Sequence, residues 1–210
     1  MIKNSMVAIP HRNQKRIILF TIDDMTYVPI LLEQLIAYRK SEIEHIYISK
    51  SFISLNKIKK NFNFFFINNY PFCFKLEDLI SYLVINLRSL ILSLFRKKSF
   101  NLKDYLTCLG ISSSYIYSLN SLETIEALKT FEPDLFLFCI FDKIANRDFL
   151  SIPRLGVYNI HLGKLPEYKG GLSAFWVLRF GDNTSGATMH KAIEQIDEGE
   201  IIKEIYVPVE

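Results

Sequence analysis

The run "DLFLFCIF", Asp134 to Phe141, constrains the fold of this chain more than any other segment. Its apolar side chains are nearly continuous, which is typical of a strand buried on both faces of a parallel sheet. Further strands are predicted at residues 16–22, 44–50, 114–119, 156–161, 186–193 and 200–210. Helical segments separate most of the early strands, and this alternation predicts a doubly wound, mostly parallel α/β sheet.

The first predicted strand runs into "TIDDMTY", which contains no glycine. A dinucleotide-binding turn or a Walker loop needs glycines at this point, because the backbone must approach a phosphate closely. A nucleotide site of either type is therefore not expected here, and the fold alone does not fix the function.

With 210 residues, the chain suits one domain, 1–210. Residues 56–103 are predicted to be a helical insertion that includes a long apolar helix, Leu76 to Lys98. Polar side chains such as Asp78 and Arg88 argue against a membrane span, since they are costly in hydrocarbon. We expect this helix to pack on a core or to join two subunits of a homodimer. A helix on a membrane surface, in an adaptor protein, is the alternative.

The composition is that of a globular protein, with 50% hydrophobic and 22% charged residues and a net charge of +3. No dense Lys/Arg stripe is present, so nucleic-acid binding is not expected. Cys73, Cys108 and Cys139 are not spaced as metal ligands, and no metal site is predicted. Reduced cysteines and the lack of a signal peptide point to the cytoplasm.

Asn159 and His161 are the strongest candidates for chemistry in this chain. They lie two residues apart on a predicted strand, so their side chains share one face at its carboxyl end. An amide and an imidazole on one face can stabilise a carbonyl oxygen that becomes an oxyanion. A hydrogen-bonded structural pair is an equal alternative. Asp197, in "IDEGE", can orient a histidine, act as a base or simply form an Asx-turn.

The segment "NIHLGKLPEYKGG" resembles the Asn-x-His…Leu-Pro-x-Tyr-Arg-Gly signature of the folate-dependent formyltransferases. Asp197 follows Asn159 by 38 residues, in the Asp-x-Gly context of that family. The preceding segment "FEPDLFLFCIFDKIANRDFLSIPRLGVY" is also similar to the family's buried strand, folate loop and helix. The resemblance covers residues 122–202 and implies a Rossmann-like sheet of the formyltransferase type.

This resemblance implies transfer of a formyl group from 10-formyltetrahydrofolate, without a metal, to an amine. Asn159 and His161 would stabilise the oxyanion, and Asp197 would hold His161 or help to remove the amine proton. Folate would contact one loop and one turn, made of Phe141, Asp142, Lys143, Ile144 and Ala145 and of Ile193, Glu194, Gln195 and Ile196. His190 matches a position that lines the same pocket, although a buried structural histidine is an equal alternative.

Gly163 and Trp176 are similar to residues of the nucleotide-sugar N-formyltransferase branch of this family. That likeness implies a nucleotide-linked amino sugar as the acceptor, such as dTDP-4-amino-4,6-dideoxyglucose, used for surface polysaccharides such as O-antigen. Lys169, Trp176 and His190 are the candidate substrate contacts, although a solvated lysine and a core tryptophan are the commoner cases. Because Glu210 follows Asp197 closely, no C-terminal tRNA-binding domain is expected. Formylation of methionyl-tRNA or another amine, and an inactive folate-binding relative, are the alternatives.

Overall fold

The computed structural model describes residues 15–24, 28–50 and 101–209. Nearly all of the expected insertion, 56–103, and the whole of the expected helix Leu76 to Lys98 lie outside these residues. The subunit contact expected there therefore also lies outside the described part of the chain. Within the described ranges, no helix is long and apolar enough to cross a membrane.

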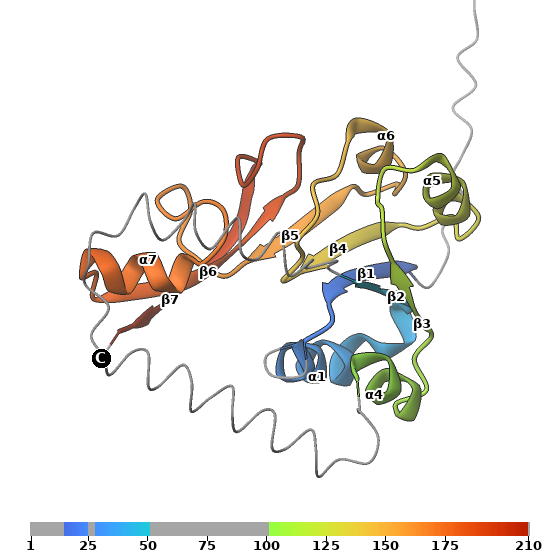
Figure 1. Ribbon diagram of the computed structural model, residues 1–210, viewed down its shortest axis with the longest axis horizontal. Coiled ribbons are helices and arrows are strands. Elements are labelled where there is room, and N and C mark those ends of the chain that lie inside the picture. Colours follow the sequence, from blue (N-terminus) through green and yellow to red (C-terminus); the bar gives the residue numbers. More distant parts are fainter. Residues whose placement is uncertain (1–14, 25–27, 51–100, 210) are drawn as a thin grey trace, which may run out of the picture.

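The elements follow the order that the hydrophobic pattern predicts (Figure 1). The first half contains β1 (Ile17–Ile22), α1 (Val28–Arg39), the short 3-10 helix η1 (Lys40–Glu42), β2 (Ile43–Ser49), α4 (Leu102–Cys108) and β3 (Ser113–Ile116). The second half contains α5 (Leu122–Lys129), β4 (Leu135–Cys139), α6 (Arg147–Leu150), β5 (Val157–His161), α7 (Ser173–Phe180), β6 (Thr184–Lys191) and β7 (Ile201–Pro208).

Local sequence signals explain where several helices begin and end. The side chains of Asn101, Ser121 and Asn146 each accept a hydrogen bond from a backbone N–H in the first turn of α4, α5 and α6. Ser121 caps α5 through the N–H of Thr124, although the sequence offers no Glu at that position. Gly181 ends α7 in the left-handed conformation, with φ of 71°, as expected for a glycine after a helix.

The strands of the described residues form a 7-stranded sheet in the order β3-β2-β1-β4-β5-β6-β7. The pairs from β3 through β5 are parallel, while β6 and β7 add antiparallel strands at one end. The predicted doubly wound, mostly parallel sheet is therefore confirmed. The central strand is β4, with β1 beside it, and both are apolar because helices cover both of their faces.

Two hydrophobic clusters pack on opposite faces of this sheet. On one face, α1 and α4 place Leu32 and Leu106 against Ile46 of β2. On the other face, the α5 and α6 side, Phe149 packs against Phe20 and Phe136 with ring centroids 5.4 and 5.1 Å apart. Each fully buried side chain of this size stabilises the fold by roughly 1.5–3 kcal/mol. These clusters hold β4 and β5 in place, and the candidate site lies at the ends of those strands.

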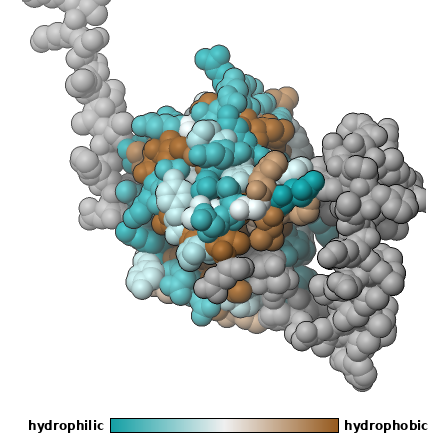
Figure 2. All heavy atoms as spheres, turned by 90° about the vertical axis from the view of Figure 1, so that its left-hand side faces the viewer, coloured by the Kyte–Doolittle hydropathy of each residue, from teal (hydrophilic) through white to brown (hydrophobic). Residues whose placement is uncertain are grey.

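The other end of the sheet is much less buried. β7 is an edge strand whose side chains are mostly exposed, including Ile205 and Val207. On α7, Leu178 and Phe180 are exposed as well. Figure 2, which faces this end of the molecule, shows hydrophobic surface lying among hydrophilic surface. The hydrophobic groups are interspersed with polar ones, so this end has no purely apolar face in that view.

Candidate active site

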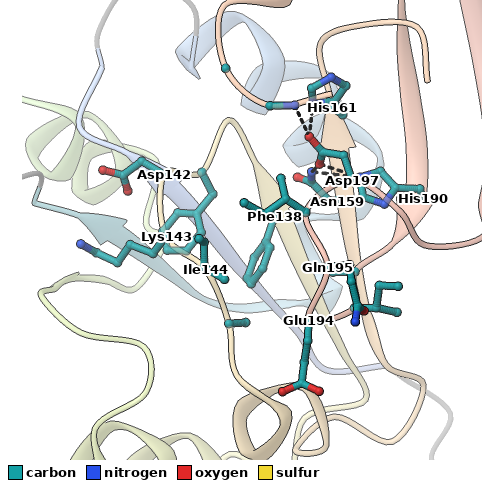
Figure 3. A pocket seen from close by; sticks show the side chains of 17 residues that line it. Phe138, Asp142, Lys143, Ile144, Asn159, His161, His190, Glu194, Gln195 and Asp197 are labelled. Carbon is teal, nitrogen blue, oxygen red and sulfur yellow. Dashed lines mark hydrogen bonds and ion pairs between the residues drawn. The ribbon is translucent and has the colours of Figure 1, made fainter. Parts of the chain in front are cut away.

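A pocket of about 400 Å³ lies where β4 and β5 end and where the loop between β6 and β7 folds back. It is lined by Phe138, Phe141, Asp142, Lys143, Ile144, Ala145, Asn159, His161, Gly170, Gly171, His190, Ala192, Ile193, Glu194, Gln195, Ile196 and Asp197. The carboxyl ends of parallel strands are the usual place for ligands in open α/β sheets. In Figure 3 the side chains of Asn159, His161, His190 and Asp197 gather on one side of this pocket, across from Asp142 and Lys143.

Strand β5 places Asn159 and His161 on the same side, as the two-residue spacing predicts. On one edge β5 pairs in parallel with β4, and on the other it pairs antiparallel with β6. The antiparallel register puts His190 directly opposite Asn159. His161 and His190 are only 8% and 2% exposed, so each ring must find hydrogen-bond partners inside the protein.

The carboxylate of Asp197 joins these groups into a single cluster. Its Oδ1 lies 3.3 Å from Nδ2 of Asn159 and 3.3 Å from Nε2 of His190. Its Oδ2 lies 3.4 Å from Nδ1 of His161 and accepts a 2.7 Å hydrogen bond from the backbone N–H of Gly170. Asp197 itself has φ of 53°, in the left-handed region. An aspartate tolerates this region better than most residues, which helps to explain its place in this turn.

Asp197 is held as an anion. Burial acts to raise the pKa of its carboxyl group, but hydrogen bonds from His190 and Gly170 and the charges of the two imidazoles outweigh burial and lower the pKa. Donors that favour the ionised form therefore decide the balance. The site keeps a negative charge between two histidines, where it can stabilise a proton on either ring.

The tautomers of the two histidines follow from backbone carbonyls, which can only accept hydrogen bonds. Nε2 of His161 lies 2.6 Å from the carbonyl oxygen of Tyr168 and must therefore carry a hydrogen. Nδ1 of His190 lies 3.1 Å from the carbonyl oxygen of Lys191 and carries a hydrogen for the same reason. The nitrogen of each ring that faces Asp197 therefore carries a hydrogen only when the ring is a positively charged imidazolium, and in that form it donates to the carboxylate. Those two nitrogens are the ones that can take up a proton.

Asn159 lines the pocket and carries two side-chain N–H groups. Its Nδ2 lies 3.1 Å from Nε2 of His190 and 3.3 Å from Oδ1 of Asp197. Both of its side-chain N–H groups thus have protein partners in this structure. A carbonyl oxygen entering the pocket would have to replace one of these two bonds, and the carboxylate and imidazole would then rearrange around it.

The structure places thirteen of the predicted site residues around this one pocket. They include Asn159, His161, Asp197 and His190 and both segments expected to contact folate, 141–145 and 193–196. Lys169 and Trp176 are not among the lining residues. Nζ of Lys169 lies 3.0 Å from Glu198 at the surface, and Trp176 stacks on Phe180 of α7 with ring centroids 5.8 Å apart.

Four lining residues had not been predicted: Phe138, Gly170, Gly171 and Ala192. Phe138 is on the buried strand immediately before the predicted folate loop, so its position near that loop could have been predicted from the sequence. The backbone N–H of Gly170 carried no sequence signal beyond the glycine pair, because any residue has such a group.

Much of the remaining pocket lining is apolar, although Asp142, Lys143, Glu194 and Gln195 also belong to it. Phe138, Phe141 and Ile144 contribute from the β4 side, and Ile193 and Ile196 from the loop between β6 and β7. An apolar wall facing a few convergent polar groups suits a flat, partly polar ring system. Among the described residues, no group of three or more His, Cys, Asp or Glu could hold a metal ion.

Residues 112–210 match the sequence model of a known family, described as formyl transferase. The bifunctional polymyxin resistance protein ArnA of Wigglesworthia glossinidia brevipalpis is 35% identical over 96 residues, which are 46% of this chain and 15% of that protein. The methionyl-tRNA formyltransferase of Thermotoga maritima is 39% identical over 92 residues, which are 43% of this chain and 29% of that protein. The matched segment thus spans less than a third of either relative.

Solved structures share the fold of the chain at low identity. Phosphoribosylglycinamide formyltransferase from Streptococcus pneumoniae TIGR4 superposes with a TM-score of 0.57 at 17% identity, covering 93% of this chain and 83% of that chain. A sugar N-formyltransferase from Shewanella sp FDAARGOS_354 gives 0.54 at 15% identity, covering 92% and 58%. The segment 112–210, which matches the formyl transferase model, contains the whole polar cluster, and the chain shares the fold of these solved structures.

Proposed function

We propose that this protein transfers a formyl group from 10-formyltetrahydrofolate to the amino group of a nucleotide-linked amino sugar. The observation that carries the proposal is the cluster of Asn159, His161, His190 and Asp197 at the edge of one pocket, inside the segment that matches the formyl transferase family. The expected acceptor is dTDP-4-amino-4,6-dideoxyglucose, in the biosynthesis of a surface polysaccharide.

Formyl transfer requires a hydrogen-bond donor near the carbonyl oxygen and a group that accepts the proton of the amine. When the amine attacks the formyl carbon, a C–N bond forms and negative charge develops on the oxygen. The amide of Asn159, which lines the pocket, becomes the donor once the oxygen replaces one of its protein partners, and losing such a donor typically costs roughly 3–4 kcal/mol of barrier. The bond from the formyl carbon to the folate nitrogen then breaks. One proton leaves the amine, and the departing nitrogen takes one up.

His161 and Asp197 are assigned the role of accepting the proton that leaves the amine. Nδ1 of His161 is the free nitrogen of the neutral ring and lies 3.4 Å from Oδ2 of Asp197. A proton taken up there, directly or through water, is stabilised by the carboxylate, whose own pKa is lowered. General-base help of this kind contributes typically 10²- to 10⁴-fold. His161 also places its positive charge beside the developing oxyanion once it is protonated.

Folate is assigned to the apolar wall. Residues 141–145 and 193–196 both line the pocket, and we assign the planar pterin ring to the space next to Phe141, Ile144 and Ile193. Backbone groups of the two segments supply hydrogen bonds to the ring edges. This assignment puts the formyl carbon toward Asn159 and His161, because only that end of the pocket carries the polar cluster among the lining residues.

The sugar acceptor is supported by sequence features around β5 and α7. Gly163 and Trp176 are the residues that resemble the sugar-specific branch. Lys169, at the surface next to Gly170, can leave Glu198 and meet a diphosphate, because its ion pair is exposed and exposed pairs are weak. Trp176 is partly exposed on α7, so part of its ring is open to a ligand.

Methionyl-tRNA is the second candidate acceptor. The methionyl-tRNA formyltransferase of Thermotoga maritima is more similar over the matched segment, at 39% identity, than the ArnA relative at 35%. The matched segment is the formyl transferase domain, which would hold the formyl donor for either acceptor. The net charge of +3 without a basic stripe favours a small acceptor over tRNA.

The test is a direct assay of the purified chain with 10-formyltetrahydrofolate. Acceptors are a panel of dTDP- and UDP-linked amino sugars, methionyl-tRNA and glycinamide ribonucleotide, and mass spectrometry detects the replacement of one amine hydrogen by a formyl group. Product with an amino sugar supports the proposal. Product only with methionyl-tRNA establishes the second candidate, and folate binding without any product identifies an inactive relative. His161→Asn serves as the catalytic control, because it removes the proton site without a large change in volume.

A further inference from the structure

Ser173 is a buried hydroxyl that the proposed reaction does not use. It is the first residue of α7 and is 6% exposed. Its Oγ lies 3.2 Å from Nε2 of His161, 3.3 Å from the carbonyl oxygen of Tyr168 and 3.4 Å from the carbonyl oxygen of Gly170. Nothing in the sequence signalled this contact, because serine is also an ordinary residue at the start of a helix.

The hydrogen-bond roles around Ser173 can be assigned. Nε2 of His161 carries a hydrogen, because it lies 2.6 Å from the carbonyl oxygen of Tyr168. Oγ of Ser173 must then accept from that N–H, as a second acceptor. Its own hydrogen is free to point at one of the two carbonyl oxygens, which only accept. The single N–H of His161 therefore has two oxygens beside it, and both belong to the segment 168–173.

Gly163 provides the room for this arrangement. A Cβ atom at position 163 would lie 2.7 Å from Cβ of Ser173 and 2.8 Å from Nε2 of His161. Both distances are shorter than real Cβ contacts, so any other residue there would push Ser173 or the imidazole away. The carbonyl oxygen of Gly163 is in turn fixed by a 2.8 Å buried hydrogen bond from Thr188 of β6. Gly163, which resembles the sugar-specific branch in the sequence, is thus also required for the close packing of Ser173 against His161.

The segment 168–173 also holds Asp197. The backbone N–H of Gly170 donates to Oδ2 of Asp197 at 2.7 Å. Gly170 has φ of 81° and Leu172 has φ of 62°, so the backbone turns sharply twice between Tyr168 and α7. These turns let one short segment face both partners of the His161–Asp197 pair. A leucine in this region is strained, and such strain is typically stored where a structure needs one geometry.

We propose that Ser173, with Gly163 beside it, is a positioning residue for His161. Its hydroxyl keeps the Nε2–H of His161 directed at the segment 168–173, so that Nδ1 faces Asp197 and exchanges the proton. The link to catalysis rests on the proposed formyl transfer, whereas the hydrogen-bond arrangement does not. Ser173 touches neither the pocket nor the reacting atoms, since it is absent from the pocket lining.

The experiment compares the wild type with Ser173→Ala, which removes one buried oxygen and no carbon. Ser151→Ala is the matched control, because Ser151 is exposed and its hydroxyl contacts only Asp148 of α6. Two quantities are measured: kcat for formyl transfer, and the exchange rate with water of the Nε2–H proton of His161, followed by ¹⁵N NMR. A loss of folded protein would be seen in the circular dichroism and Tm of each variant.

In Ser173→Ala we expect kcat to fall roughly ten-fold, with little change in KM. This factor corresponds to the net free energy of one hydrogen bond when that energy is lost from the transition state. The Nε2–H proton should exchange faster by a similar factor, since one of its two acceptors is gone. Gly163→Ala should show both effects, because its Cβ displaces the same contact. Ser151→Ala should match the wild type in both measurements.

The inference is overturned if folded Ser173→Ala keeps the kcat of the wild type. It is also overturned if the variant keeps the wild-type exchange rate of the Nε2–H proton, because the role requires both quantities to change. If the wild type forms no product with any acceptor, the proposed function fails. The exchange rate then decides by itself whether Ser173 holds the imidazole. The two failures are thus separate: one is seen in the wild type, and the other only in the variant.

Discussion

The side-chain amide of Asn159 lies 3.3 Å from the carboxylate of Asp197, although 38 positions of the chain separate them. The antiparallel strand β6 brings them together, because it pairs with β5 and then turns back toward the pocket. The amide keeps the carboxylate in a fixed place, and the carboxylate in turn faces both imidazoles. Changing the charge at position 197 should therefore affect the whole cluster.

Asp197→Asn is expected to abolish most of the formyl transfer. The variant keeps the shape of the side chain and an oxygen for the N–H of Gly170, but it removes the negative charge that stabilises a proton on His161. We expect kcat to fall by roughly 10²- to 10⁴-fold, the usual contribution of general-base help. Steady-state kinetics at neutral pH measures this loss.

The matched control for that variant is Glu200→Gln, an exposed acid in the same loop that does not line the pocket. It should keep wild-type kcat and circular dichroism. Full activity of Asp197→Asn would show that the carboxylate does not handle the proton and would remove it from the mechanism.

The lowered pKa of Asp197 makes a second prediction, about stability against pH. Burial acts to raise this pKa, but the hydrogen bonds from His190 and Gly170 and the imidazole charges lower it overall. Between the ordinary carboxyl pKa of about 3.9 and the lowered pKa, the unfolded chain binds a proton and the folded chain does not. The stability from this group is therefore complete above about 3.9 and is lost as the pH falls through the lowered value.

We expect the wild type to be more stable than Asp197→Asn at pH 7 and this difference to shrink as the pH approaches 3. Urea unfolding of both proteins at several pH values gives the difference in the free energy of unfolding. A difference that stays constant over this range would mean that the carboxyl group has its ordinary pKa in the folded protein.

The sequence was most informative where a repeating pattern decides the structure. The apolar run from Asp134 predicted β4, and the two-residue spacing of Asn159 and His161 predicted their common face. Asp197 was found through its resemblance to a family motif, since its place depends on the register and bulge of β6 with β7. The hydrogen bond of His161 to the carbonyl oxygen of Tyr168 could not be predicted, because every residue has a carbonyl group.

The contacts of several side chains could not be predicted from their positions in the sequence. Lys169 is in the predicted turn but pairs with Glu198 at the surface, because a flexible lysine takes the nearest exposed carboxylate. Trp176 follows the helical periodicity of α7 and packs on Phe180. The roles of Gly163 and Ser173 depend on contacts shorter than 3.5 Å between neighbouring loops, which no sequence spacing specifies.

Gly199→Ala is expected to destabilise the protein. A Cβ atom at position 199 would lie 1.7 Å from the carbonyl oxygen of Lys191, which belongs to the backbone and cannot rotate away. Relief would require moving the end of β6, where the N–H of Lys191 donates to Glu200 at 2.8 Å. Overpacking of this kind typically costs about 1–3 kcal/mol. Urea unfolding measures the loss in the free energy of unfolding.

Gly171→Ala is the control for that loss. No atom lies within 4 Å of a Cβ atom built at position 171, and its φ is not in the left-handed region. Its free energy of unfolding should equal that of the wild type. If Gly199→Ala and Gly171→Ala had equal free energies of unfolding, the turn between β6 and β7 would accommodate a Cβ atom at position 199, which contradicts the prediction.

His45 should limit the stability of the protein in mild acid. Its ring lies between the hydroxyls of Ser112 and Ser114, each 2.8 Å away, and contacts the ring of Tyr47 at a tilted angle. Burial lowers the pKa of His45, with Glu44 opposing and Lys103 adding to the effect. Because the unfolded chain then takes up the proton first, the free energy of unfolding should fall as the pH drops below about 6.5. His45→Gln should lose this part of the pH dependence, as measured by urea unfolding between pH 8 and pH 5. An NMR titration that gives His45 its ordinary pKa in the folded protein would contradict the prediction.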